Sequence, residues 1–201
     1  MDSLEQIVDN SGLPANEILD AFYSKCKERT FAKDELIKLP HSVEKYLSIL
    51  VDGVVAKLIY ANDKEYCVCF CFKNEFCSDY PSFVHQKESP TYLKAITEVK
   101  LLSISFLELE ELYNSNPSGN KIGKMATELI MIEQEKQVID LLTLSAEQRY
   151  KNMLENHPEV FLHIPLNLIA GYLGIAPESL SRIRKQLVEK EKSHDYKTVK
   201  A

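Results

Sequence analysis

Hydrophobic and polar positions divide the chain into three zones with different periodicities. Over residues 12–27, apolar residues recur at helical spacing behind Pro14, which predicts a short amphipathic helix. Over residues 31–106, short runs rich in β-branched and aromatic residues are separated by turn signals, which predicts strands. From about residue 118 onward the spacing is helical again. The many short strands of the middle zone favour a sandwich, roll or barrel over a parallel sheet.

The clearest predicted strands cover residues 46–51, 54–60 and 66–72. They are separated by Asp52-Gly53 and by the polar run at 61–64, and both are turn signals. We therefore expect consecutive antiparallel strands in this region.

The third zone opens with apolar residues that alternate spacings of three and four, as in a short heptad seam. One interpretation is an amphipathic helix that packs on its own domain. The other is a helix that pairs with a second copy of the chain, which is favoured because the segment links two domains and has little else to cover its stripe. The predicted dimer interface consists of Ile122, Met125, Leu129, Ile132 and Ile139, with Lys136 at a core-type position near the end.

Two further helices are predicted after this seam, and the second of them is crossed by the helix that follows. Ser145, with Gln148 three residues later, is typical of a helix start, and that helix ends before Pro158. A further helix begins at Pro165 and ends at Gly174, which suits the left-handed backbone that terminates helices. Its inner face consists of Ile169, Ala170 and Leu173, and Ile175 fills the corner that follows.

The helix that begins at Pro177 has two different faces. Leu180, Ile183 and Leu187 recur at the spacing that faces the preceding helix. The outward positions are polar, which is what a recognition helix in the DNA major groove needs. These residues, at 165–186, predict a DNA-binding helix-turn-helix. The outward residues are Glu178, Ser181, Arg182 and Lys185.

Composition agrees with a globular chain. The 201 residues suffice for one large or two smaller domains, and no apolar run approaches the roughly 20 residues that cross a bilayer. The residues at 1–5 resemble no secretory signal, so we expect a cytoplasmic location. The net charge is −6, but from Pro177 onward seven Lys/Arg outnumber four Asp/Glu. A basic end on an acidic chain is compatible with phosphate contacts.

Four of the five cysteines lie between residues 67 and 77, which is unlike a secreted disulfide framework. Strand alternation predicts that Cys67, Cys69 and Cys71 share one face, with Cys77 just beyond. They either fill a packed layer or, in the alternative, sense oxidants or a metal. No paired carboxylates, phosphate loop or nucleophile elbow indicate an enzyme, and we predict no metal and no certain cofactor.

The order of β-rich zone, long helix and helix-turn-helix resembles the Crp–Fnr family of bacterial transcription regulators. The runs at 144–150 and 164–186 carry the strongest likeness. The resemblance implies an α+β fold with an antiparallel, jelly-roll-like β-roll (the cyclic-nucleotide-binding-like domain) over residues 1–117. A dimerisation helix at 118–142 and a winged-helix-like helix-turn-helix domain at 143–201 follow. It also implies three partners: double-stranded DNA with an inverted-repeat site, a second copy of the chain, and RNA polymerase.

In this family a Glu and an Arg four residues later read bases, and these positions match Glu178 and Arg182. Arg can pair with guanine through two hydrogen bonds, and Glu can accept from a cytosine amino group. The resemblance makes Ser179, Ser181 and Lys185 candidates for phosphate or sugar contacts.

The implied effector pocket departs from the family pattern. Cyclic-AMP binders carry Gly-Glu-aliphatic-Gly and, about ten residues later, Arg-Ser/Thr-Ala, whereas only Glu75 matches here. Ser89 lies near the place of the phosphate-binding Arg, and Lys87 or Lys94 are the cations nearby in sequence. Because a buried phosphate needs a cation or free amides, we expect that cyclic AMP is not the effector. A degenerate sensor or interaction module is the remaining alternative. The pocket positions are Asn74, Glu75, Phe76, Cys77, Ser89, Pro90 and Thr91.

Overall fold

A computed structural model describes residues 20, 22–115, 117–158 and 160–198 of the chain. These residues form two compact units, one ending at Gln137 and one beginning at Val138. The division falls within a single long helix, α5 (Pro117–Thr143).

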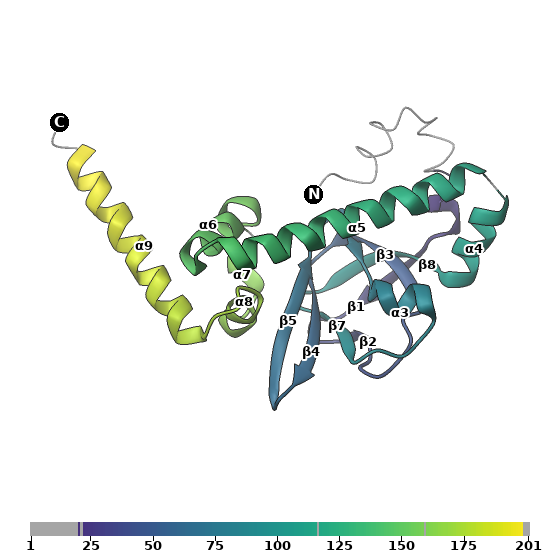
Figure 1. Ribbon diagram of the computed structural model, residues 1–201, viewed down its shortest axis with the longest axis horizontal. Coiled ribbons are helices and arrows are strands. Elements are labelled where there is room, and N and C mark those ends of the chain that lie inside the picture. Colours follow the sequence, from purple (N-terminus) through teal and green to yellow (C-terminus); the bar gives the residue numbers. More distant parts are fainter. Residues whose placement is uncertain (1–19, 21, 116, 159, 199–201) are drawn as a thin grey trace. The chain divides into compact units, whose positions relative to one another are not determined.

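The first unit is built on two four-stranded antiparallel sheets (Figure 1). One has the order β1-β8-β3-β6 and the other β2-β7-β4-β5, so neighbours in each sheet come from distant parts of the sequence. This arrangement confirms the predicted roll of short antiparallel strands. The strands are β1 (Lys27–Phe31), β2 (Leu36–Lys38), β3 (Tyr46–Asp52), β4 (Val55–Ala61), β5 (Lys64–Cys71), β6 (Phe76–Cys77), β7 (Thr91–Ala95) and β8 (Val99–Ser105).

The predicted turns lie where the sequence places them. Gly53 has a φ of +92°, and an added Cβ would lie 2.2 Å from the Glu98 carbonyl oxygen, so only glycine fits between β3 and β4. Asn62 and Asp63 both have positive φ and connect β4 to β5, as in a tight hairpin turn.

Two apolar clusters stabilise this unit. The first fills the space between the sheets, with Leu50 and Leu101 from one sheet and Val55 and Leu93 from the other, all fully buried. The second lies between β3, β8 and the helices α3 (Tyr80–His85) and α4 (Phe106–Ser115), and it includes Phe83. Val99 and Leu101 of β8 belong to the first cluster and Ile104 to the second, because side chains alternate between the two faces of a strand.

The described residues of the second unit form four helices besides the end of α5. They are α6 (Ala146–Asn156), α7 (Val160–His163), α8 (Leu166–Tyr172) and α9 (Pro177–Thr198). The capping box predicted at the start of α6 is present, because the Gln148 amide donates to the Ser145 hydroxyl and the Ser145 amide donates to the Gln148 side chain.

Some elements differ from the sequence-based expectation. The short helices α3, α4 and α7 are not predicted, because each is brief or lies beside strands with stronger signals. Of the helix expected over residues 12–27, residues 20 and 22–25 are helical, whereas 12–19 and 21 lie outside the described residues. No strand follows β8 among the described residues, so they contain no wing, and α9 continues to Thr198. Within that part of the chain, no helix has the length and hydrophobicity to span a membrane.

Candidate DNA-binding helix and effector pocket

The turn between α8 and α9 has the geometry that the sequence predicts. Gly174 has a φ of +67°, the left-handed conformation that ends a helix. Its amide donates to the Gly171 carbonyl, and the Ile175 amide donates to the Ala170 carbonyl at 3.0 Å. These bonds satisfy carbonyls at the end of α8 and redirect the chain toward Pro177, the first residue of α9.

Most of the predicted inner faces of the two helices are buried, and Leu187 is half-buried. Ile169, Ala170, Leu173 and Leu180 have at most 1% of their surface exposed, and Ile183 is also buried. Because Ala170 is small, α9 can approach α8 closely at this point. Burial of this stripe fixes which face of α9 remains outside.

Arg149 of α6 supports the same turn, a role that the sequence does not reveal. Its guanidinium donates to the carbonyls of Leu144 and Leu173, which follow the ends of α5 and α8 respectively. A planar group with several donors is suited to holding two chain ends at once.

The outward face of α9 is polar and accessible. The predicted DNA-contacting residues Glu178, Ser181, Arg182 and Lys185 are exposed, whereas Ser179 is half-buried. Arg184 lies apart from this group, since its side chain is half-buried and hydrogen-bonds to Tyr150. The exposed face of α9 therefore presents one carboxylate, one hydroxyl and two cations at helical spacing.

Part of the predicted dimer seam can be placed. Ile132 and Ile139 are exposed on α5, together with four other apolar residues. The side chains of Ile122, Met125 and Leu129 lie outside the described residues. The other exposed apolar residues of α5 are Met131, Val138, Leu141 and Leu142.

The opposite side of α5 packs on the first unit. An added Cβ at Gly123 would lie 2.4 Å from the Tyr113 hydroxyl, Thr127 hydrogen-bonds to Tyr80 at 2.7 Å, and Gln137 donates to the Val68 carbonyl at 2.8 Å. At 3.6 residues per turn, Ile132 lies about half a turn away from these three positions. These three contacts therefore use a different face of α5 from the one that carries Ile132.

The first half of the candidate effector pocket is a tight turn. Asn74 has a φ of +69°, so it occupies a backbone conformation that glycine favours and asparagine tolerates. Its amide donates to the Leu50 carbonyl, and the Glu75 carboxylate accepts from the Phe72 amide at 3.0 Å. Phe76 is half-buried and Cys77 is buried, both in β6. Glu75 therefore makes a local hydrogen bond across this turn.

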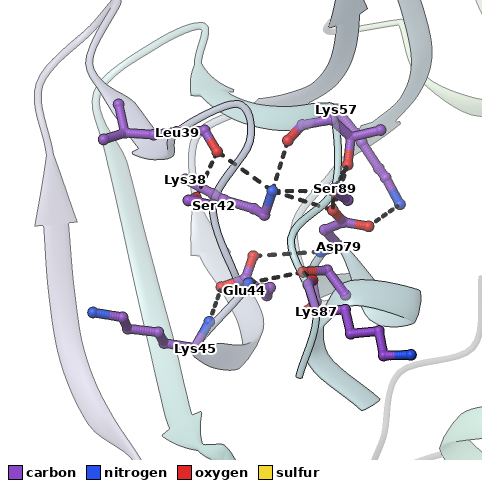
Figure 2. Close-up of polar contacts among 12 residues, drawn as sticks. Lys38, Leu39, Ser42, Glu44, Lys45, Lys57, Asp79, Lys87 and Ser89 are labelled. Atoms are coloured by element: carbon purple, nitrogen blue, oxygen red, sulfur yellow. Dashed lines mark hydrogen bonds and ion pairs between the residues drawn. The ribbon is translucent and has the colours of Figure 1, made fainter. Parts of the chain in front are cut away.

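The second half of the candidate pocket contains a buried ionic cluster that the sequence does not indicate (Figure 2). The Asp79 carboxylate lies 3.3 Å from Nζ of Lys38 and 3.3 Å from Nζ of Lys57, and it accepts hydrogen bonds from the hydroxyls of Ser89 and Thr91. Lys38 and Asp79 side chains are 2% and 3% exposed, and Lys57 is 11% exposed. Burial raises the pKa of Asp79, but these hydrogen bonds and charges outweigh it, so the pKa stays below its ordinary value.

Glu44 is the second carboxylate of this region. Its oxygens accept from the amides of Lys45 and Tyr46 at 2.9 and 3.1 Å and from the Asp79 amide at 3.4 Å. Burial raises the pKa of Glu44 despite these bonds. Backbone amides therefore satisfy the Glu44 carboxylate, and the ammonium groups of Lys38 and Lys57 pair with Asp79.

The lysines nearest to Ser89 in the sequence are not the ones that lie beside it in the structure. Lys94 pairs with Asp34 at 2.9 Å on the surface, and Lys87 is exposed. Pro90, between Ser89 and Thr91, is exposed as well. Lys38 of β2 and Lys57 of β4 converge because β2 and β4 flank β7, which begins at Thr91. Only the strand order brings these two lysines together. Distance along the sequence therefore does not indicate which lysines lie near Ser89.

The prediction that Cys67, Cys69 and Cys71 share one face of the strand is wrong for Cys67. The register of β4 and β5 shifts between Lys57 and Leu58, so Val68 is an extra residue and the alternation breaks. Cys69, Cys71 and Cys77 are joined by thiol hydrogen bonds, whereas the Cys67 thiol lies 3.6 Å from the Cys69 carbonyl.

Cys67, Cys71 and Cys77 are buried, and Cys69 is half-buried. Burial raises the pKa of Cys67, and the hydrogen bond to Cys71 together with burial raises the pKa of Cys69. Among the described residues, no group of three or more His, Cys, Asp or Glu side chains is arranged to hold a metal ion. The geometry favours the packed-layer interpretation.

Comparison with solved structures identifies the fold as that of Crp–Fnr-type regulators with a cyclic-nucleotide-binding-like domain. The global regulator CLP of Xanthomonas campestris, described as responsive to c-di-GMP, has a TM-score of 0.68 and 17% identity over 88% of this chain and 93% of its own. A putative cAMP-binding regulatory protein from Silicibacter pomeroyi has a TM-score of 0.65 and 22% identity, covering 92% of this chain and 88% of its own.

The catabolite activator protein of Thermus thermophilus is also similar, with a TM-score of 0.56 and 16% identity over 92% of this chain and 88% of its own. No family model and no curated protein sequence matches the chain. The resemblance read from the sequence is therefore confirmed at the level of the fold.

Proposed function

We propose that this protein is a cytoplasmic, sequence-specific DNA-binding transcriptional regulator of Crp–Fnr type rather than an enzyme. The observation that carries the proposal is the two-faced α9: Leu180 and Ile183 are buried, while Glu178, Arg182 and Lys185 are exposed. A helix anchored on one face and polar on the other can enter the major groove without unfolding. The shared fold supports this assignment.

The protein acts as a homodimer that pairs through α5. Ile132 and Ile139 are exposed on the side of the helix turned away from Gly123, Thr127 and Gln137, which contact the first unit. A second copy of the same helix offers the matching apolar stripe, and a two-fold pair would place two recognition helices about one DNA turn apart. The expected site is an inverted repeat, and RNA polymerase is a further partner when the regulator activates transcription.

Cyclic AMP is not the effector. The place where a phosphate would need a cation already holds the Asp79 carboxylate, which takes both nearby buried lysines. A second buried anion beside it would be repelled and poorly solvated.

A gel-shift titration on DNA upstream of the protein's own gene, at several salt concentrations, tests the DNA-binding proposal. Specific binding should persist when unlabelled random DNA is added, and the logarithm of affinity should fall linearly with the logarithm of salt concentration. The control is Lys64→Ala, which removes one exposed cation from β5 and should bind like the wild type. Binding that random DNA abolishes at every salt concentration would contradict sequence-specific recognition.

A further inference from the structure

The ionic cluster around Asp79 has the composition of an anion-binding site. Lys38, Ser89 and Thr91 converge on one oxygen of the carboxylate, and Lys57 lies beside the other. The donors come from β2, β4, the first residue of β7 and Ser89 just before it, and these strands are neighbours in one sheet. Asp79 reaches them from the N-terminal end of α3. The anion and its receptor therefore come from different elements.

The polar groups of the receptor already have partners within the chain. Besides Asp79, Nζ of Lys38 contacts the Thr91 carbonyl at 2.7 Å and the Ser89 hydroxyl at 3.2 Å. The chain around it is held by the His41 amide, which donates to the Ser89 carbonyl at 2.8 Å. Within the described part of the chain, no buried side-chain nitrogen or oxygen lacks a partner. The site thus needs an anion, and the chain supplies one.

Asp79 contributes its side chain to this site rather than to its own helix. It precedes α3, where an aspartate commonly accepts from backbone amides, but its side chain makes no such bond. The carboxylate instead bridges two buried ammonium groups, and its own amide donates to Glu44. Loss of the carboxylate would leave both lysines without their anion in a low-dielectric interior, which is strongly destabilising.

We propose that Asp79 is a built-in anion that fills the receptor formed by Lys38, Lys57, Ser89 and Thr91. It holds the α3 segment on the sheet, so the β-roll keeps this structure without an anionic effector. A small carboxylate from solution can take its place only when the Asp79 side chain is removed. The anion site itself is independent of DNA binding, whereas its regulatory consequence, DNA binding without an added effector, rests on the proposed function.

Chemical rescue tests the proposal. Asp79→Ala should lower the thermal midpoint by roughly 6 to 20 °C. Formate, which supplies the missing carboxylate, should recover a large part of that loss in a saturable way, relative to chloride at equal ionic strength. The wild type and Asp52→Ala, which removes an exposed carboxylate, should show no formate-specific shift. Asp79→Asn should be destabilised but unresponsive, because its amide occupies the space that formate needs.

The opposite results are equally clear. A formate-specific rise in the thermal midpoint of the wild type overturns the proposal. So does a thermal midpoint of Asp79→Ala that formate does not raise. If Asp79→Ala is unfolded in chloride, recovery of its circular dichroism signal in formate supports the proposal, and failure to recover at any formate concentration overturns it. Calorimetric titration of the wild type with cyclic AMP should give no binding, and micromolar affinity would overturn the proposal, because both buried lysines of the receptor already pair with Asp79.

The DNA measurement separates this proposal from the function it rests on. If formate rescues Asp79→Ala but the wild type binds no DNA, the anion site stands and the proposed function fails. If the wild type binds DNA but formate rescues nothing, the built-in anion fails and the proposed function stands.

Discussion

The guanidinium of Arg149 donates to the carbonyl oxygen of Leu173 through Nε at 3.2 Å and Nη2 at 2.7 Å. Leu173 is the last residue before the glycine turn that leads into α9, so a side chain of α6 holds the chain at the point from which α9 starts. This contact connects the stability of the second unit to its proposed function.

Arg149→Met should destabilise the protein by about 1.5–3 kcal/mol, because the Leu173 carbonyl loses a charged donor. Lys151→Met is the control on the same helix. Lys151 forms an i,i+4 pair with Glu147 at 3.1 Å on a partly exposed surface, so its loss should cost about 0.5 kcal/mol or less. Urea denaturation of both variants measures the difference, and equal stabilities would show that the Arg149 contact is unimportant.

The pair formed by Lys27 and Glu108, 2.8 Å apart, should make stability depend on pH. Hydrogen bonds from Lys27 and Ser105 lower the pKa of Glu108 to about 2 from its ordinary 4.5. Since the folded state holds this proton less tightly than the unfolded state does, the stabilisation is present above about pH 5 and is lost as the pH falls toward 2.

Glu108→Gln tests this effect, because glutamine keeps the capping bond from the Ser105 amide but carries no charge. Urea denaturation of both proteins from pH 7 to acid should give a stability difference that is largest near neutral pH and shrinks on acidification. A difference that stays constant with pH would mean that Glu108 has an ordinary pKa.

The buried cysteines should react slowly with thiol reagents in the folded protein. The reactive species is the thiolate, and the raised pKa values of Cys67 and Cys69 keep them protonated. Labelling by a maleimide should be at least about tenfold slower than at an exposed cysteine introduced by Lys64→Cys, and unfolding should release all five native thiols. Rapid labelling of Cys69 or Cys71 in the native state would favour the thiol-responsive alternative.

Replacing Ile132 and Ile139 with Glu should produce monomers, because charges on both sides of a two-fold seam repel and the apolar stripe is lost. Both side chains are exposed in the single chain, so the fold itself should survive. Gln134→Glu is the matched control, since it adds a charge to an exposed position of the same helix. Light scattering decides the outcome: a double variant that remains dimeric would place the interface elsewhere.

The helix-turn-helix could be predicted in detail because its information is local. A small residue, a glycine at the turn and apolar residues at helical spacing specify which side chains are buried and which, such as Arg182, are outside. The cluster of Lys38, Lys57 and Asp79 could not be predicted, because it depends on strand order across 41 positions of separation. The prediction that the three cysteines of β5 share one face failed for a related reason. The extra residue at Val68 breaks the alternation, and it is visible only in the pairing with β4.

The most direct test of the central claim is to select binding sites from random DNA and then to measure single-base preferences of variants. The account predicts an inverted repeat with half-sites about one DNA turn apart. Arg182→Ala should lose about 1–3 kcal/mol and relax the preference at one base pair per half-site, whereas Lys185→Ala should weaken all sequences about equally. Selection of an asymmetric site, or an Arg182→Ala protein with unchanged base preferences, would contradict recognition of DNA by α9.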